Sequence, residues 1–203
     1  MKSNVFLGFS KEISQFFREG KVGVIPTDTI YGLCASAFDK KAVEKVYSLK
    51  KRSFGKPFII LISSISELEL FGIELSEKEE DFIQKVWPGK VSVIFPCQKN
   101  EFEYLHRGKN SLAFRVPAKE KLRNFLSKSG PLIAPSANFE GEKVSRRIGA
   151  AQKYFKDQVD FYVNGGLLFS RPSTLVQMKN GQVVFLRLGA WEKMVRKIFK
   201  DKK

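Results

Sequence analysis

The chain has 203 residues, of which 43% are apolar, and its 36 lysines and arginines exceed its 21 acidic residues to give a net charge of +15. These values exclude a disordered chain, and the length predicts a single domain, residues 1–203, with its own core. The longest clean apolar run, 58–62, is far too short to span a bilayer, and MKSNVFLGFS lacks a signal-peptide pattern, so we expect no membrane segment.

Strand-like and helix-like segments alternate along the chain, which is the pattern of an α/β fold. Capping residues mark three helix starts, at Ser10, at Asp39 and at the capping box of Ser76 and Glu79. In chain order, we predict helices near 10–20, 39–47, 76–87, 122–130, 148–155 and 191–199, and strands near 21–25, 58–62, 91–95, 112–116, 132–134, 159–163, 174–177 and 183–186. Hairpin-like joins, of which Asn180-Gly181 is the clearest, predict a mixed sheet.

The positive charge indicates polyanionic partners, such as nucleic acid, nucleotides or an anionic membrane surface. The plain alternative, that the lysines only keep the surface solvated, stays open. The basic, amphipathic last helix fits a membrane surface, but a terminal helix docked on the core with its charges in water is favoured.

Several common catalytic motifs are absent from the sequence. It contains neither GxxxxGK[ST] nor GxGxxG, and its only histidine, His106, lies in a polar stretch where we expect an exposed loop residue. Two isolated cysteines, Cys34 and Cys97, do not make a zinc site, and they indicate reduced thiols in a cytoplasmic protein. An enzyme with this composition would depend on positioning and on neutralisation of charge.

Short hydroxyl, amide and cationic side chains gather just beyond predicted strands and helices. They occur in VIPTDTIYGL (Thr27, Asp28, Thr29, Tyr31), in SLKKRSFGKPF (Lys50, Arg52, Lys56), at Arg115, in PSAN (135–138), at Ser173-Thr174 and at Arg187. Singly, most have a structural explanation: lysine and arginine complement a helix C-terminus, serine and asparagine make turns, and threonine or aspartate caps a helical turn. Arg115 differs, because a guanidinium in an apolar strand is costly unless it meets an anion. Together, these groups indicate a ligand site at the strand ends.

These motifs occur in the order in which the threonylcarbamoyl-AMP synthase (YrdC/Sua5) family has them, and the sequence resembles that family over about 22–189. The matching pieces are IPTDTIYGL, KKRSFGKP, WPGK, LAFRVP, APSAN, the region of Gly141 and Ser145, NGG, RPSTLV and LRLG. The resemblance implies a twisted mixed sheet with flanking helices and a large, basic, concave cavity. It also implies the short, single-domain type of the family.

The resemblance further implies synthesis of L-threonylcarbamoyladenylate and pyrophosphate from L-threonine, bicarbonate and ATP, with Mg²⁺ on the nucleotide. That product would serve N6-threonylcarbamoyladenosine formation at position 37 of tRNA through a downstream threonylcarbamoyl transferase complex. Carried over by motif, the resemblance also implies roles for individual residues. Threonine is held by Thr29, Arg115, Ser136 and Ser173, and the phosphates are held by Lys50, Arg52 and Lys56, of which Lys50 and Arg52 are catalytic. The nucleotide is contacted by Ser111, Asn138, Ser145 and Arg187, and Tyr31 lines the site or packs beneath it.

The chain departs from the family pattern at several positions. The family often has glycine for Cys34, proline for Ser53 and Lys90, threonine for Ser92, serine for Glu140 and, in some longer relatives, histidine for Leu61. None of these changes removes an implied ligand of threonine or phosphate, but they bear on substrate preference. Three alternatives remain: a module that binds tRNA or double-stranded RNA without this activity, a carbamoyl-transfer paralogue, and a paralogue with the same fold and a different substrate.

Overall fold

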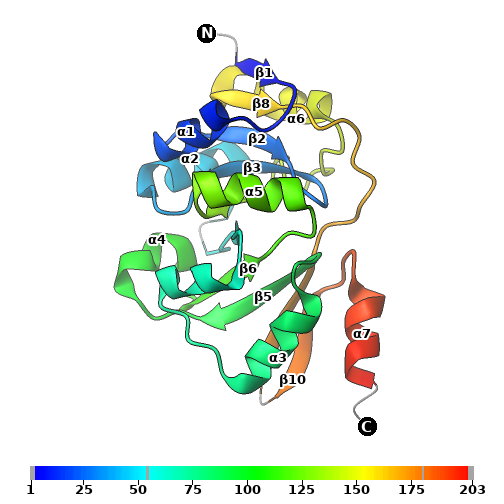
Figure 1. Ribbon diagram of the computed structural model, residues 1–203. Helices are drawn as coiled ribbons and strands as arrows, with labels where there is room; N and C mark the ends of the chain where they lie inside the picture. Colours follow the sequence, from blue (N-terminus) through cyan, green and yellow to red (C-terminus); the bar gives the residue numbers. More distant parts are fainter. Residues whose placement is uncertain (1–2, 54, 180, 201–203) are drawn as a thin grey trace.

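The computed structural model describes residues 3–53, 55–179 and 181–200, which form a mixed sheet in the strand order β1-β8-β2-β3-β7-β4-β6-β5-β9-β10 (Figure 1). The strands are β1 (Asn4–Phe6), β2 (Gly23–Pro26), β3 (Tyr31–Ser36), β4 (Ile59–Leu61), β5 (Val91–Pro96), β6 (Ser111–Arg115), β7 (Leu132–Ile133), β8 (Phe161–Val163), β9 (Thr174–Lys179) and β10 (Gln182–Arg187). Strand β4 is parallel to β6, and β5 to β9, whereas β2–β3 and β9–β10 are antiparallel. The predicted mixed α/β fold is therefore confirmed; the hairpin residue Asn180 lies outside the described residues.

Helices cover both faces of the sheet. They are α1 (Lys11–Arg18), α2 (Lys40–Lys50), α3 (Glu77–Val86), α4 (Glu103–His106), α5 (Glu120–Ser129), α6 (Ile148–Phe155) and α7 (Glu192–Lys200), with short 3-10 turns η1 (Ile65–Phe71), η2 (Asn100–Phe102) and η3 (Lys156–Gln158). Three predicted caps are present: Ser10 accepts from Ile13 N, Asp39 accepts from Ala42 N, and Ser76 pairs with Glu79 in a capping box.

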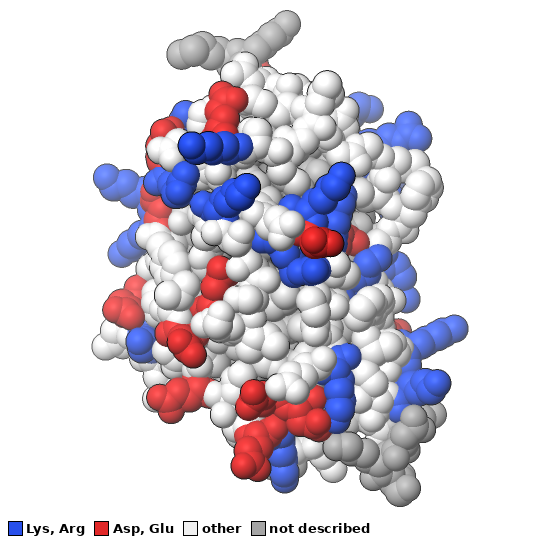
Figure 2. Space-filling view, viewed as in Figure 1, with Lys and Arg blue, Asp and Glu red and all other residues white. Residues whose placement is uncertain are grey.

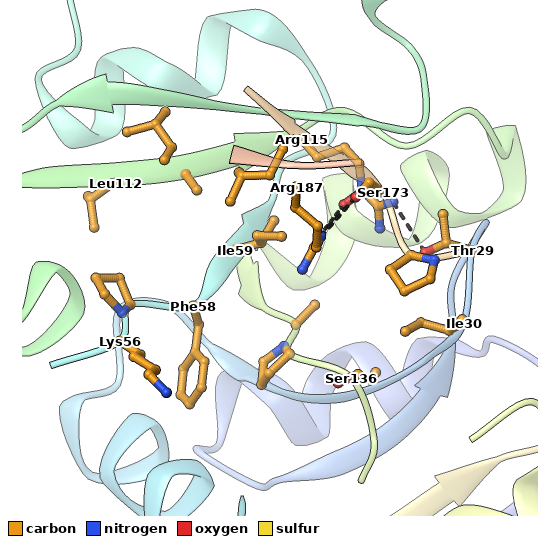
Figure 3. A pocket seen from close by; sticks show the side chains of 18 of the residues that line it. Thr29, Ile30, Lys56, Phe58, Ile59, Leu112, Arg115, Ser136, Ser173 and Arg187 are labelled. Atoms are coloured by element: carbon orange, nitrogen blue, oxygen red, sulfur yellow. Dashed lines mark hydrogen bonds between the residues drawn. The ribbon is translucent and has the colours of Figure 1, made fainter. Parts of the chain in front are cut away.

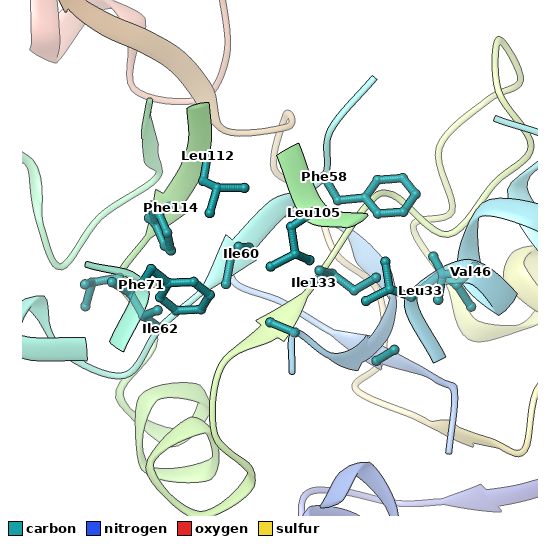
Figure 4. Packing of buried hydrophobic residues seen from close by; sticks show 14 of the residues in the cluster. Leu33, Val46, Phe58, Ile60, Ile62, Phe71, Leu105, Leu112, Phe114 and Ile133 are labelled. Atoms are coloured by element: carbon teal, nitrogen blue, oxygen red, sulfur yellow. The ribbon is translucent and has the colours of Figure 1, made fainter. Parts of the chain in front are cut away.

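Successive strand residues pack into different cores because side chains alternate across a strand. Ile60 belongs to a large core to which α2, α3, α6 and α7 contribute. Figure 4 shows the part of this core around Ile60 and Phe71. The next residue, Leu61, joins a second core with α1 and α5, where Phe17 packs edge-on against Phe161 at 5.2 Å between ring centroids. A sheet buried on both faces explains the near-continuous apolar runs in these strands.

The last helix docks on the protein, as predicted. Val195 is fully buried, and the Phe199 ring lies 5.2 Å from that of Phe82 on α3. Within the described chain, no helix is both long and apolar enough to cross a membrane.

Strands β3 and β1 were not predicted, and the burial of His106 differs from the prediction. No strand was predicted between 25 and 39, yet Tyr31–Ser36 forms β3, a strand whose glycine, cysteine and small residues give no clear alternation. Edge strand β1 is too short to have a recognisable pattern. His106 was expected in an exposed loop; it lies instead in α4, which packs against α2, and is only 3% exposed.

The excess of positive charge is not uniform over the surface. On the face in Figure 2, acidic side chains gather in the lower part, where α3 has Glu77, Glu79 and Glu80 in its first turn, and lysines and arginines dominate above. A polyanion would therefore meet a polarised surface.

Candidate functional site

A cavity of about 710 Å³ lies where the β2–β3 turn, the 134–136 segment and the ends of β6, β9 and β10 converge (Figure 3). Its walls include the cationic side chains of Arg52, Lys56, Lys109, Arg115 and Arg187. None of its described lining residues is an aspartate or a glutamate. A concave site with cations and no lining carboxylate favours anionic ligands.

The β2–β3 turn is organised by the hydroxyl of Thr27. Its Oγ1 donates to Ile30 O at 2.6 Å and accepts from Thr29 N and Ile30 N at 3.1 and 3.2 Å. Thr27 Oγ1 also lies 3.0 Å from Thr29 Oγ1. Thr27 thus caps a tight strand-to-strand turn rather than a helix, and this turn directs Thr29 to the cavity wall.

Arg115 ends β6 with its guanidinium buried, and its anion is Asp28. Arg115 NH2 lies 3.3 Å from Asp28 Oδ1, and Arg115 NH1 donates to Thr29 Oγ1 at 3.3 Å. The other carboxylate oxygen of Asp28 accepts from Ala118 N at 3.0 Å. Asp28 therefore holds the turn and orders the arginine at the same time, two roles that the sequence could not separate.

Ser173 and Arg187 form the adjacent wall. Arg187 donates from Nε and NH2 to Ser173 O at 3.1 and 3.0 Å, and from NH2 to Ser173 Oγ at 3.0 Å. Ser173 Oγ also lies 2.9 Å from Ser92 Oγ. Burial, followed by repulsion from Arg115 and Arg52, lowers the pKa of Arg187. The guanidinium groups of Arg115 and Arg52 are thus both close enough to Arg187 to repel its charge.

Lys56 lies at the other end of the cavity, together with Phe58 (Figure 3). Arg52 Nε donates to Lys56 O at 3.0 Å and its NH2 to Pro57 O at 3.4 Å, which holds the guanidinium against its own loop. Ser111, at the start of β6, also lines the cavity. Burial lowers the pKa of Arg52, while Glu140 and Tyr47 oppose that shift.

Lys50, Asn138 and Ser145 lie behind the cavity wall, not among its lining residues. Lys50 Nζ donates to Ser136 O at 2.6 Å and to Asn138 O at 2.7 Å. Asn138 Nδ2 donates to Phe139 O and Glu142 O, and the Ser145 hydroxyl donates to Ala137 O. These contacts position the 134–138 segment that carries Ser136; the predicted contacts of these three residues with phosphates or nucleotide stay predictions.

Tyr31 both borders the cavity and packs beneath it. Its side chain is fully buried, and its hydroxyl donates to Gly166 O at 2.8 Å and accepts from Gly165 N at 2.9 Å. The tyrosine therefore joins the start of β3 to the segment after β8.

The buried Lys50 predicts a pH effect on stability. Desolvation, and then Arg52, lower the pKa of Lys50 from 10.5 to about 8, so the unfolded chain binds more protons than the folded one between these values. Stability therefore rises with pH in this window. The free energy of unfolding of the wild type minus that of Lys50→Met should increase by about 2 kcal/mol from about pH 7.5 to about pH 9.5 in urea titrations. The same difference for Lys41→Met, which removes an exposed lysine, should not change over this pH range. If the difference for Lys50→Met also did not change with pH, burial would not lower the pKa of Lys50.

Lys109 and Gln177 line the cavity but were not predicted as site residues. Lys109 precedes Ser111, Ala113 and Arg115 at intervals of two, and all four line the cavity. Strand alternation does not explain Lys109, however, because this residue lies before β6 and the next residue, Asn110, has a φ of +50°. Gln177 follows Ser173 and Leu175 at intervals of two, and all three line the cavity, so period-two alternation along β9 was a usable signal for Gln177.

Comparisons with known proteins show which family the chain belongs to. The family model Sua5_yciO_yrdC, described as "Telomere recombination", matches residues 15–189. A Pyrococcus abyssi "Threonylcarbamoyl-AMP synthase" is 31% identical over 86% of this chain, which spans 52%, about half, of that relative's length. A Stutzerimonas stutzeri protein of the same name is 26% identical over 86% of this chain and 95% of its own length.

A solved structure agrees with these sequence matches. P. abyssi Sua5 complexed with L-threonine superposes with a TM-score of 0.88 at 27% identity, over 97% of this chain and 61% of that one. The match to the family model and the similarity to this solved structure lead to the same assignment. The chain belongs to the Sua5/YciO/YrdC family.

Proposed function

We propose that this protein synthesises L-threonylcarbamoyladenylate and pyrophosphate from L-threonine, bicarbonate and ATP. The observation that carries the proposal is the convergence of Arg52, Arg115 and Arg187 on one cavity whose described lining has no carboxylate. Two anionic reactants, a carbamate and a triphosphate, require such a surplus of cations. The names of the matched relatives support the same reaction.

Threonine occupies the end of the cavity formed by Thr29, Arg115, Ser136 and Ser173. The Arg115 guanidinium, already oriented by Asp28 and Thr29, receives the amino acid's carboxylate. The hydroxyls of Ser136 and Ser173 orient the remaining polar groups, since Ser173 is itself fixed by Arg187.

ATP occupies the opposite end, with its phosphates near Arg52 and Lys56 and its nucleoside toward Ser111. Arg187, which is hydrogen-bonded to Ser173 at the threonine end, contacts the nucleotide from between the two ligands. Mg²⁺ would be carried by the triphosphate and would neutralise part of its charge beside Arg52 and Lys56. The part of the chain that the structure describes contains no group of three or more His, Cys, Asp or Glu placed to hold a metal ion. Lys50, Asn138 and Ser145 support these contacts through the 134–138 segment.

The chemistry then follows from positioning. The threonine amine bonds to the carbon of carbon dioxide and releases one proton to solvent, or it bonds to the carbon of bicarbonate with loss of one water molecule, and either route yields a carbamate. A carbamate oxygen attacks the α-phosphorus, and the bond to pyrophosphate breaks with its electron pair on the leaving group. Guanidinium groups suppress the repulsion between these anions and align them, so no nucleophile from the protein is required.

We also propose that the product serves tRNA N6-threonylcarbamoyladenosine synthesis in the cytoplasm, through a downstream transferase complex, and that the chain acts as one domain. Direct binding of tRNA or double-stranded RNA to the basic surface is the main rival. RNA binding driven by phosphate contacts should weaken steeply with ionic strength.

The decisive experiment is an assay of pyrophosphate release with ATP, Mg²⁺ and bicarbonate, with and without L-threonine. We expect release to depend on both threonine and bicarbonate, with the adenylate identified by mass spectrometry. Pyrophosphate release that is the same with and without L-threonine would overturn the proposal. Salt-sensitive RNA binding without any release would favour the RNA-binding module.

A further inference from the structure

Glu140 binds the loop that carries the cations of the ATP end. Its Oε1 accepts from Lys56 Nζ at 2.7 Å, and its Oε2 accepts from Ser53 N at 2.8 Å and from Ser53 Oγ at 3.1 Å. Lys56 lines the cavity, whereas Glu140 is not among the lining residues. The carboxylate therefore reaches from behind the wall to an ammonium that faces the cavity.

The backbones on both sides of this contact are held in place. Glu140 N donates to Lys50 O at 3.1 Å, and the Lys56 carbonyl accepts from Arg52 Nε and from Tyr47 OH at 3.0 and 3.1 Å. The Lys56 side chain, by contrast, is 57% exposed. A change of partner for Lys56 thus needs only side-chain rotation, while Glu140 keeps its contacts with Ser53.

Glu140 is a permanent anion at neutral pH. The hydrogen bond from Lys56, followed by that from Ser53 N, lowers its pKa to about 2. An ion pair between partly exposed side chains is weak, because water screens both charges. A polyphosphate carries several charges and can therefore displace one carboxylate from the lysine.

We propose that Glu140 competes with the phosphates of ATP for Lys56 and so sets the affinity for the nucleotide. Without ATP, the carboxylate holds the ammonium; with ATP, Lys56 turns to the phosphates and Glu140 retains Ser53. This inference rests on the proposed function, since it takes the phosphates to lie at Lys56. It makes Glu140 a determinant of ATP affinity that does not itself contact the nucleotide.

Calorimetric titration of Glu140→Gln with ATP and with inorganic tripolyphosphate tests the proposal. Glutamine keeps an acceptor for Ser53 but loses the charge, so both ligands should bind about two- to fivefold tighter at low salt, with the gain shrinking as salt rises. Threonine affinity should not change. Glu142→Gln, an exposed neighbour with the same loss of charge, should leave ATP affinity within about twofold of the wild type.

A double-mutant cycle with Lys56→Met separates competition from general repulsion. In the Lys56→Met background, Glu140→Gln should no longer tighten ATP binding. A full gain in that background, or unchanged or weaker ATP binding in the Glu140→Gln single variant, would overturn the inference. A wild-type protein that binds neither ATP nor tripolyphosphate would instead refute the proposed function.

Discussion

Arg52→Ala should reduce kcat/KM for threonine-dependent pyrophosphate release on the order of 100- to 1000-fold, because it removes a preorganised cation from the phosphate end of the cavity. The guanidinium is held by the carbonyls of Lys56 and Pro57, so it needs no rearrangement when charge develops on the leaving group. Its removal should lower the free energy of unfolding by less than about 2 kcal/mol, since the two bonds that it loses are near the surface. Steady-state kinetics and urea unfolding of the same preparation measure the two effects.

Two further variants sharpen this result. Arg18→Ala removes an exposed arginine from the last turn of α1 and should change kcat/KM by less than about twofold. Arg52→Lys keeps the charge but not the planar fork, so its activity should fall between those of Arg52→Ala and the wild type. If Arg52→Ala lowers the fraction of folded protein and the molecules that remain folded keep full turnover, the arginine is structural rather than catalytic.

Asp28→Asn should lower the free energy of unfolding by about 3 kcal/mol, because it leaves the buried guanidinium of Arg115 without its anion. The side chains of Asp28 and Arg115 are only 3% and 5% exposed, so water cannot replace the lost charge. The same variant should raise the KM for threonine, since Arg115 loses the partner that orients it. Urea unfolding and threonine titration give the two readouts.

Asp39→Asn is the matched control for this substitution. Asp39 caps α2 by accepting from Ala42 N, and asparagine is an equally good cap, so its stability should change by less than about 0.5 kcal/mol. If Asp28→Asn is as mild as this control, the buried pair is not what fixes Arg115.

Local signals in the sequence predicted local structure well. The caps at Ser10 and Asp39 depend on neighbours three residues away, and both helices begin where predicted. The hydroxyl-rich strand ends were also recognised, and Thr29 and Ser173 do line one cavity. Features set by distant segments were missed: the strand through Tyr31–Ser36, whose partners include β7, and the burial of His106.

The partner of Asp28 shows the same limit at the candidate site. An aspartate in a turn can cap that turn, and no local pattern reveals that it also faces Arg115 from a strand far along the chain. Likewise, Lys50 at the end of α2 fits a simple interaction with the helix dipole. Only the fold brings its ammonium to the carbonyls of Ser136 and Asn138.

The position of the β9–β10 hairpin at the edge of the sheet has a consequence for folding. Ser173 directly precedes β9 and Arg187 ends β10, whereas Thr29 lies in the turn between the interior strands β2 and β3, and Arg115 ends the interior strand β6. Edge elements open at a lower free energy than the strands they cover, and parallel pairing of β5 with β9 closes a long loop late in folding. Amide hydrogen exchange should therefore find the hairpin protected less than β2, β3 and β6, and a chain cut before β9 would lose Leu175, Gln177 and Arg187 from the cavity wall.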